Sequence, residues 1–122
     1  MKINTNINSI VIYDNISIID AMYKLNIASD QTLFVVDEGN FLLGSLTDGD
    51  LRRCIIAGAD LHNPISSIYN KEPHFLLENE FDNEVIETIF KEDDFKIIPI
   101  ISDTKKIIGF ISFKDYTNKP NI

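Results

Sequence analysis

The sequence predicts an α/β (α+β) fold in which two tandem β-α-β-β-α repeats pack as one module with pseudo-two-fold symmetry. The first observation is an internal repeat at a spacing of 65 residues. FLLGSLTDGD at 41–50 aligns by residue class with KIIGFISFKD at 106–115, and LFVVDE at 33–38 aligns with IPIISD at 98–103. The second observation is length, because one copy is too short to bury both faces of its sheet. The pair is therefore expected to be the folding unit of the 122-residue chain.

The first repeat begins with an apolar strand at 10–12, followed by a helix that Asn15 or Ser17 caps. Apolar runs at 33–37 and 41–47 flank a turn and predict a hairpin. A second helix starts after Thr47 and ends at Gly58. The residues expected to face the core in these two helices are Ile18, Ala21, Met22 and Leu25, then Leu51, Ile55 and Ile56.

The second repeat follows the same order without a gap, so that its first strand at 75–77 aligns with 10–12. Its helix begins at Asp82 or Asn83, and apolar runs at 97–102 and 107–112 form the hairpin. The residues expected on the inner face of the helix are Val85, Ile86, Ile89 and Phe90. The expected domains are repeat 1 (1–57), a linker (58–74) with a helical turn near 65–69, repeat 2 (75–117) and a polar tail (118–122).

Charge and composition exclude several classes of function. The net charge is −8, from 19 acidic and 11 basic residues, so the surface repels phosphate backbones and no nucleic-acid partner is expected. No apolar run approaches the about 18 residues of a membrane span, and the N-terminus lacks the apolar core of a signal peptide. Cys54 is the single cysteine, which excludes an intramolecular disulfide and suits the cytoplasm.

One motif, Gly-x-(Leu/Ile)-(Thr/Ser)-x-x-Asp, occurs in both repeats and ends at Asp50 and Asp115. Thr47 and Ser112 end a strand, and each aspartate falls in the first helical turn. A carboxylate there can accept hydrogen bonds from a ribose diol, and the helix start can receive a phosphate. The alternative is a pair of capping boxes, each stabilising a helix start by about 1 kcal/mol without any ligand. The sequence leaves both interpretations open.

Other polar residues carry weaker signals. Arg53, with Arg52, lies in the helix after Asp50 and could clamp a phosphate or pair with nearby acids; Lys96 and Lys114 have weaker cases of the same kind. His62 and His74 lack the spacing and neighbours of a metal pair, so no metal site is expected. No histidine pairs with Cys54, and a Ser/His/Asp set and a Gly-rich phosphate loop are both absent. We therefore expect no catalytic residue and no required cofactor in this chain.

The doubled motif and element order resemble the CBS-domain pair, or Bateman module, over about residues 1–117. The linker string SSIYNKEPHFL (66–76) is similar to that family's entry into its second repeat, with Tyr69 where Met is common. LLGSLTDGDLRRCIIAGADLHNPISSIYNKEP is similar to CBS pairs that precede bacterial sugar-phosphate nucleotidyltransferases. A related string occurs in arabinose-5-phosphate isomerases. Met1 and the tail at 118–122 favour the first context, with the catalytic domain absent.

The resemblance implies a regulatory module that binds AMP, ATP or GMP-type nucleotides between its repeats, forms homodimers and controls an attached enzyme. By position, Thr47 and Asp50 serve one cleft and Ser112 and Asp115 the other, with the aspartates holding ribose. Residues near Ser9 and His74 line the base through backbone groups.

The family often has a basic residue where this chain has Thr32 and Ile97, which argues against phosphate contacts there. Because Ile97 and Phe113 are expected to crowd the second cleft, the cleft at Thr47 and Asp50 is favoured. A ligand-free dimerisation scaffold is the alternative function.

Overall fold

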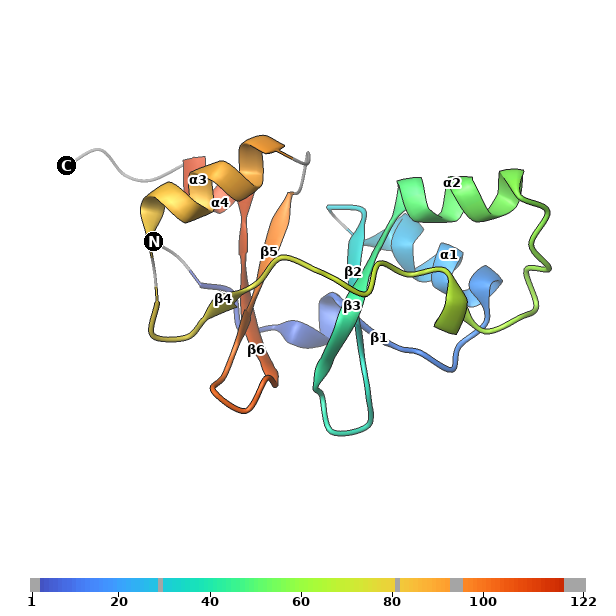
Figure 1. Ribbon diagram of the computed structural model, residues 1–122, viewed down its shortest axis with the longest axis horizontal. Coiled ribbons are helices and arrows are strands. Elements are labelled where there is room, and N and C mark those ends of the chain that lie inside the picture. Colours follow the sequence, from blue (N-terminus) through green and yellow to red (C-terminus); the bar gives the residue numbers. More distant parts are fainter. Residues whose placement is uncertain (1–2, 29, 81, 93–95, 118–122) are drawn as a thin grey trace.

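The computed structural model describes residues 3–28, 30–80, 82–92 and 96–117, and Figure 1 shows two similar halves side by side. In each half, a three-stranded sheet carries helices at one end and a hairpin turn at the other. The elements of the first half are η1 (Ile7–Ser9), β1 (Val11–Tyr13), α1 (Ile18–Ile27), β2 (Thr32–Val36), β3 (Leu42–Thr47), α2 (Asp48–Ile56) and η2 (Ile65–Ser67). Those of the second are β4 (Leu76–Leu77), α3 (Asn83–Glu92), β5 (Ile97–Ile101), β6 (Ile107–Ser112) and α4 (Phe113–Thr117).

The two sheets have the same topology. β1 runs parallel to β2, and β2 pairs antiparallel with β3; β4, β5 and β6 repeat this arrangement. The register shifts at one place in each hairpin, between Val35 and Val36 and between Ile100 and Ile101, which are 65 positions apart. The predicted fold class and the repeat spacing are confirmed for both hairpins and for the first helix of each repeat.

The first strand departs from the gap-free alignment. Ile12 lies opposite Val35 in β2, whereas Leu76 lies opposite Ile100 in β5. Because Leu76 follows Ile12 by 64 positions, repeat 2 has one additional residue between its first strand and its helix. The gap-free alignment is therefore wrong at this strand. Three consecutive apolar residues stand at this place in each repeat, so hydrophobic pattern alone could not set the register.

Each sheet buries both of its faces. One face packs against the helices of its own repeat, and the opposite face packs against the other sheet. The buried residues between the two sheets are Ile10, Phe34, Val36, Ile97, Ile107 and Phe110. Both repeats contribute to this layer, which makes the pair one packed unit.

The helices confirm most of the predicted caps and inner faces. Ser17 caps α1, since its hydroxyl accepts a hydrogen bond from the Asp20 amide at 3.2 Å, and the Asp82 carboxylate accepts one from the Glu84 amide at 2.9 Å. Buried residues on their inner faces are Ile18, Ala21 and Leu25 in α1, and Ile86, Ile89 and Phe90 in α3. The expectation that Val85 is buried is wrong, because it faces solvent.

In α2 the predicted inner face is partly wrong. Leu51 and Cys54 are buried, whereas Ile55 is 47% and Ile56 79% exposed. Residues three apart share the core-facing side of this short helix, and the next two positions turn away from it. Two large apolar side chains are thereby left on the surface.

Two chain segments cross between the repeats. Asn4 exchanges two backbone hydrogen bonds of 2.9 Å with Phe110 in β6, and Asn70 exchanges two of 2.9 Å with Ser45 in β3. Each crossing segment passes over the glycine of the repeated motif. A Cβ on Gly44 would collide with the Asn70 carbonyl and the Tyr69 ring, and one on Gly109 would lie 2.9 Å from the Asn4 carbonyl oxygen. The motif glycines therefore serve close backbone approach.

The hairpin turns also join the repeats. The Leu42 amide donates to the Lys105 carbonyl at 3.1 Å, and the Ile107 amide donates to the Asn40 carbonyl at 3.0 Å. Asn40 and Lys105 both have left-handed backbones, with φ of 66° and 68°. This exchange preserves the pseudo-two-fold relation. Among the described residues, no helix is long and apolar enough to cross a membrane.

Candidate functional site

The predicted binding residues lie at separate places. Ser112 and Asp115 line a cavity of about 450 Å³ between the repeats. Asp50 and Arg53 line a shallower pocket of about 360 Å³, mainly within repeat 1. His74 lines a third pocket of about 520 Å³ beside α3. Only Ser112 and Asp115 therefore share a cavity to which both repeats contribute.

The inter-repeat cavity forms where β6 ends and α4 begins. The crossing of Asn4 onto β6 brings the segment before β1 to this place, and with it Ser9 and Ile10. The starts of β2 and β5 also meet here, at Thr32 and Ile97. The lining residues are Asn4, Ser9, Ile10, Ile27, Ala28, Asp30, Thr32, Ile97, Phe110, Ser112, Lys114 and Asp115. Five of these residues are apolar and the others are polar or charged, a mixed lining that together with this volume suits a small organic ligand with polar groups.

Asp115 presents an available carboxylate to this cavity. Its amide donates to the Ser112 hydroxyl at 3.0 Å, so Ser112 caps the start of α4. The Asp115 carboxylate makes no hydrogen bond or ion pair within the described part of the chain. A carboxylate in this state can accept hydrogen bonds from a ligand without first losing a protein partner.

Thr47 and Asp50 form a complete capping box at the start of α2. The Thr47 amide and hydroxyl donate to Asp50 Oδ2 at 2.9 and 3.1 Å, and the Asp50 amide donates to Thr47 Oγ1 at 3.4 Å. Arg53 Nη2 donates to Asp50 Oδ1 at 2.7 Å. Both Asp50 oxygens are thus engaged. The capping box, which was the alternative to ribose binding, is present at this site. Arg53 forms the ion pair that was the alternative to phosphate binding.

The crowding expected at the second cleft does not close it. Ile97 lines the cavity. Phe113 instead packs edge-on against Phe90 of α3, with the ring centroids 5.2 Å apart. Of the two motif aspartates, Asp115 is the one whose carboxylate has no partner among the described residues. The preference for the cleft at Thr47 and Asp50 remains a prediction.

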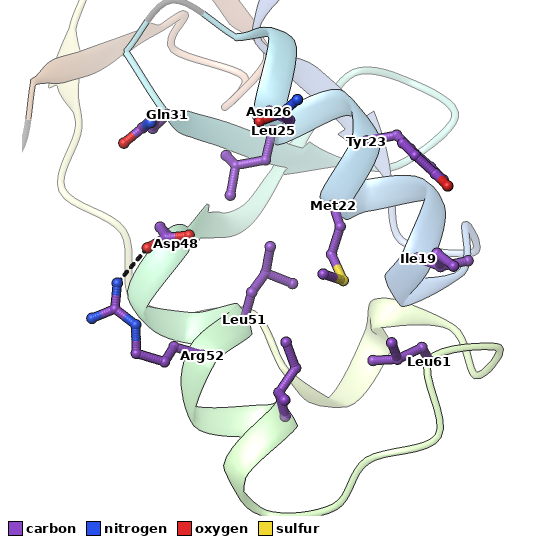
Figure 2. A pocket seen from close by; sticks show the side chains of 11 residues that line it. Ile19, Met22, Tyr23, Leu25, Asn26, Gln31, Asp48, Leu51, Arg52 and Leu61 are labelled. Carbon is purple, nitrogen blue, oxygen red and sulfur yellow. Dashed lines mark hydrogen bonds and ion pairs between the residues drawn. The ribbon is translucent and has the colours of Figure 1, made fainter.

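A groove between α1 and α2 is the second notable surface (Figure 2). It has a volume of about 550 Å³, and its walls are mostly apolar. Figure 2 shows Met22 and Leu51 pointing into the space between the helices, with the Asp48–Arg52 ion pair of 2.6 Å beside it. Tyr23 on its rim is 69% exposed. The sequence did not reveal this groove, since Ile55, one of its lining residues, was expected in the core.

Neither a metal centre nor a reactive thiol emerges from the described residues. No group of three His, Cys, Asp or Glu side chains among them could hold a metal ion. Cys54 is buried, and its thiol donates to the Leu51 carbonyl at 3.1 Å. Burial raises the pKa of this thiol, which keeps it protonated and unreactive near neutral pH.

Comparison with known proteins assigns the architecture. The family model for the CBS domain matches residues 3–57. The solved structure of the CBS domain pair of protein MJ0100, in complex with 5′-methylthioadenosine and S-adenosyl-L-methionine, has a TM-score of 0.73 and 21% identity, covering 88% of this chain and 87% of that one. This likeness extends over both repeats. The chain folds as a CBS-domain pair.

Two further relatives resemble this CBS pair. CBSX2 in complex with AMP has a TM-score of 0.75 and 19% identity, over 94% of this chain and 89% of its own. Arabinose 5-phosphate isomerase GutQ of Salmonella typhi is 28% identical over 100 residues, which are 82% of this chain and 31% of GutQ. The chain thus spans about a third of the length of the first curated relatives it matches. The structural likenesses establish fold alone.

The CBS pair also places residues at its cavity that the sequence did not single out. Asp30 and Asn4 line it, although neither belongs to the repeated motif. Comparison of the two repeats does not single out Asp30, because the corresponding residue of repeat 2 is Phe95. Asn4 reaches the cavity because the N-terminal segment crosses to repeat 2, and no local sequence pattern predicts that crossing.

Proposed function

We propose that this CBS pair is a regulatory, non-catalytic module that binds an adenosine- or guanosine-type ligand in the inter-repeat cavity. The Asp115 carboxylate, which has no partner among the described residues, lies in a cavity shared by both repeats and carries the proposal. A ligand that touches both repeats favours one arrangement of them over others, and so can bias an attached domain. CBSX2 with AMP and MJ0100 with adenosine derivatives support this ligand class.

The roles follow from the chemistry of the lining residues. Asp115 accepts hydrogen bonds from the ribose hydroxyls, and Ser112 holds the helix that carries it. Ile10 and Ile97 supply apolar walls for a base, and backbone groups near Ser9 read its edge.

A second site at Thr47, Asp50 and Arg53 ranks below this one, with His74 in a separate pocket beside α3. A ribose there would compete with Arg53 at Asp50 Oδ1 and with the two Thr47 groups at Oδ2. This competition subtracts from binding energy. We therefore propose one primary ligand for each CBS pair.

A thermal-shift panel tests the proposal. The full chain is mixed at millimolar concentration with adenosine, guanosine, AMP, ATP, GMP and S-adenosylmethionine. A ligand at 100 times its Kd adds about 2.7 kcal/mol to the free energy of unfolding. We expect a shift in the wild type, its loss in Asp115→Asn and its retention in Asp50→Asn. No shift with any compound, or equal shifts in wild type and Asp115→Asn, contradicts the proposal.

The α1–α2 groove supports a second function, dimerisation. We propose that a second copy of the chain packs there, because Tyr23 and Ile55 are 69% and 47% exposed and line this mostly apolar groove between α1 and α2. Dimerisation without a ligand would make the pair a scaffold.

Sedimentation of the chain with and without ligand tests this assembly. We expect a dimer that Ile55→Asp converts to monomer, because Ile55 is an exposed residue that lines the groove. Ile108→Asp is the matched control, since Ile108 is an exposed isoleucine of β6 outside the groove. A monomeric wild type, or equal dissociation by Ile108→Asp, contradicts dimerisation through the groove.

We further propose that the pair regulates a sugar-phosphate enzyme encoded on the same chain. The domains would be repeat 1 (1–57), the linker (58–74), repeat 2 (75–117) and a tail (118–122) that leads into a nucleotidyltransferase domain. The 28% identity to GutQ supports the alternative of an isomerase domain instead. Sequencing the gene on both sides of residues 1–122 distinguishes the two alternatives, because a nucleotidyltransferase domain and an isomerase domain carry different catalytic motifs.

A further inference from the structure

We infer that the ligand of the inter-repeat cavity carries no phosphate and is a nucleoside with an uncharged or cationic 5′ group. This inference rests on the proposed function and narrows its ligand class. It follows from the charge of the cavity, from the residues at the two strand starts and from the hydrogen bonds at the start of α4.

The cavity is negative before any ligand enters. Asp30 and Asp115 both line it, and among the described lining residues Lys114 alone is basic. Neither carboxylate makes a hydrogen bond or ion pair with another described side chain. The chain as a whole has a net charge of −8. A phosphate monoester would add about 1.5 to 2 negative charges at neutral pH, and like charges repel strongly in a partly enclosed site.

The strand starts offer no phosphate contact. Thr32 begins β2 and Ile97 begins β5, and both side chains are buried in the cavity wall. The Thr32 hydroxyl donates to the Asp30 carbonyl at 3.2 Å, so its one proton is engaged. Ile97 has no polar group. At these two strand starts, a phosphate would therefore find no hydrogen-bond donor that is free to bind it.

Two amides at the start of α4 are engaged as well. The Phe113 amide donates to the Lys96 carbonyl at 2.6 Å, and the Asp115 amide donates to the Ser112 hydroxyl. These two backbone donors are thus used internally and are not offered to a phosphate.

A phosphate-free nucleoside meets none of these obstacles. Its ribose hydroxyls donate to Asp115, and its base packs between Ile10 and Ile97. Asp30 then remains to accept a hydrogen bond from the 5′ substituent or to pair with a positive charge on it. The cavity's acceptors thus match a ligand that donates hydrogen bonds.

Isothermal titration of the full chain tests the inference. The ligands are adenosine, 5′-methylthioadenosine, S-adenosylmethionine, AMP and ATP. We expect the first three to bind at least about tenfold more tightly than AMP, because each unfavourable like-charge contact in such a site is worth a factor of this order. ATP should bind more weakly still.

Two variants assign the effect to the cavity. Asp30→Asn removes one negative charge from its wall, and we expect AMP to gain at least about threefold relative to adenosine. Asp103→Asn is the matched control, since this exposed acid lies in the turn at the opposite end of β5 and β6 and should leave the ratio unchanged.

The outcomes separate the two proposals. AMP or ATP binding as tightly as adenosine, with both lost in Asp115→Asn, overturns the inference and leaves the proposed function standing. A ratio that Asp103→Asn changes as much as Asp30→Asn also overturns it. The proposed function itself fails if no compound binds or if binding survives Asp115→Asn, and the inference fails with it.

Discussion

At the scale of single residues, Asp50 and Asp115 occupy the same motif position but have different partners. Asp50 accepts hydrogen bonds from both polar groups of Thr47 and pairs with Arg53. The Asp115 amide donates to the Ser112 hydroxyl, and the Asp115 carboxylate has no partner among the described residues. The same motif position therefore holds an engaged carboxylate in repeat 1 and an available one in repeat 2.

This difference predicts unequal stability effects. Asp50→Ala should lower the free energy of unfolding by about 1–2 kcal/mol, because the capping box is lost. Asp115→Ala should cost less, since the Ser112 hydroxyl still accepts the amide at position 115. Urea denaturation measures both. Asp48→Ala, which removes an exposed ion pair with Arg52, is the control and should change stability by less than about 0.5 kcal/mol. Equal losses at positions 50 and 115 would refute this difference.

Cys54 predicts a pH dependence. Burial raises the pKa of its thiol above the ordinary value, with the Asp50 charge adding to the effect. A raised folded-state pKa stabilises the fold below the unfolded pKa and loses that contribution as pH rises. The free energy of unfolding should therefore decline above about pH 9. Burial also raises the pKa of Tyr69 and Tyr116, so these groups add to the decline. Urea titrations at pH 7, 9 and 10 measure the decline.

Two measurements isolate the cysteine in that decline. Cys54→Ala should fall less steeply than the wild type between pH 9 and 10. The native thiol should react with a disulfide reagent at least about tenfold more slowly than glutathione at pH 8. Fast labelling of the folded protein would show that the thiol is accessible and its pKa unperturbed.

At the scale of elements, the crossing segments and hairpins tie each repeat to the other. Asn4 and Asn70 each pair with a strand at the edge of a sheet. Between the two hairpin turns, the carbonyls of Asn40 and Lys105 accept hydrogen bonds from amides of the opposite hairpin. These are backbone contacts, so they depend on where the chain passes and only weakly on side-chain identity.

The motif glycines should respond unequally to substitution. Gly44→Ala should cost about 3 kcal/mol, because the added Cβ meets the Asn70 backbone. Gly109→Ala should cost about 1 kcal/mol, as the nearest atom is less close. Gly49→Ala in α2 should instead raise stability by about 0.5–1 kcal/mol, because its Cβ would make ordinary contacts with the flexible Arg53 side chain and the Thr47 hydroxyl. Thermal or urea unfolding ranks the three, and a smaller loss at Gly44 than at Gly109 would contradict the close crossing.

At the scale of the whole molecule, the layer between the sheets holds the pair together. Phe34 and Val36 from one repeat pack with Ile97 and Phe110 from the other. Separation of the repeats would expose this apolar layer to water, which opposes folding of either alone.

A fragment of residues 1–74 should accordingly fail to fold cooperatively. It retains repeat 1 and the linker but exposes Ile10, Phe34 and Val36. Circular dichroism during heating should show a broad, shallow change for the fragment and one sharp transition for the full chain. A sharp transition in the fragment would show that the repeat folds independently.

The elements were predictable where the pattern was local. Hairpin turns, the Ser17 cap and the inner face of α1 all follow from residues within a few positions of one another. The exposure of Ile55 and Ile56 was not predictable, because a run of three consecutive apolar residues in a helix does not say which members face the core. The register of β4 was not predictable for the same reason, because three consecutive apolar residues also stand there.

The candidate site divides along the same line. The repeated motif identified Ser112 and Asp115, but the crowding expected from Ile97 and Phe113 placed them below Thr47 and Asp50. Arg53 was recognised as a candidate ion-pair partner, but its choice of Asp50 required the side-chain positions. Asp30 and Asn4 join the cavity only because the chain crosses between repeats.

By itself, the sequence determined that two similar β-α-β-β-α units follow one another. It also determined that in each unit a strand ends at a hydroxyl residue and the next helix carries a carboxylate in its first turn. Residue class and spacing are sufficient for that, since local backbone geometry depends on near neighbours. The tertiary structure alone decided which carboxylate stays open, which cavity both repeats share and how negative that cavity is. Those properties arise from groups distant in the chain, and only the packing of one sheet on the other brings them together.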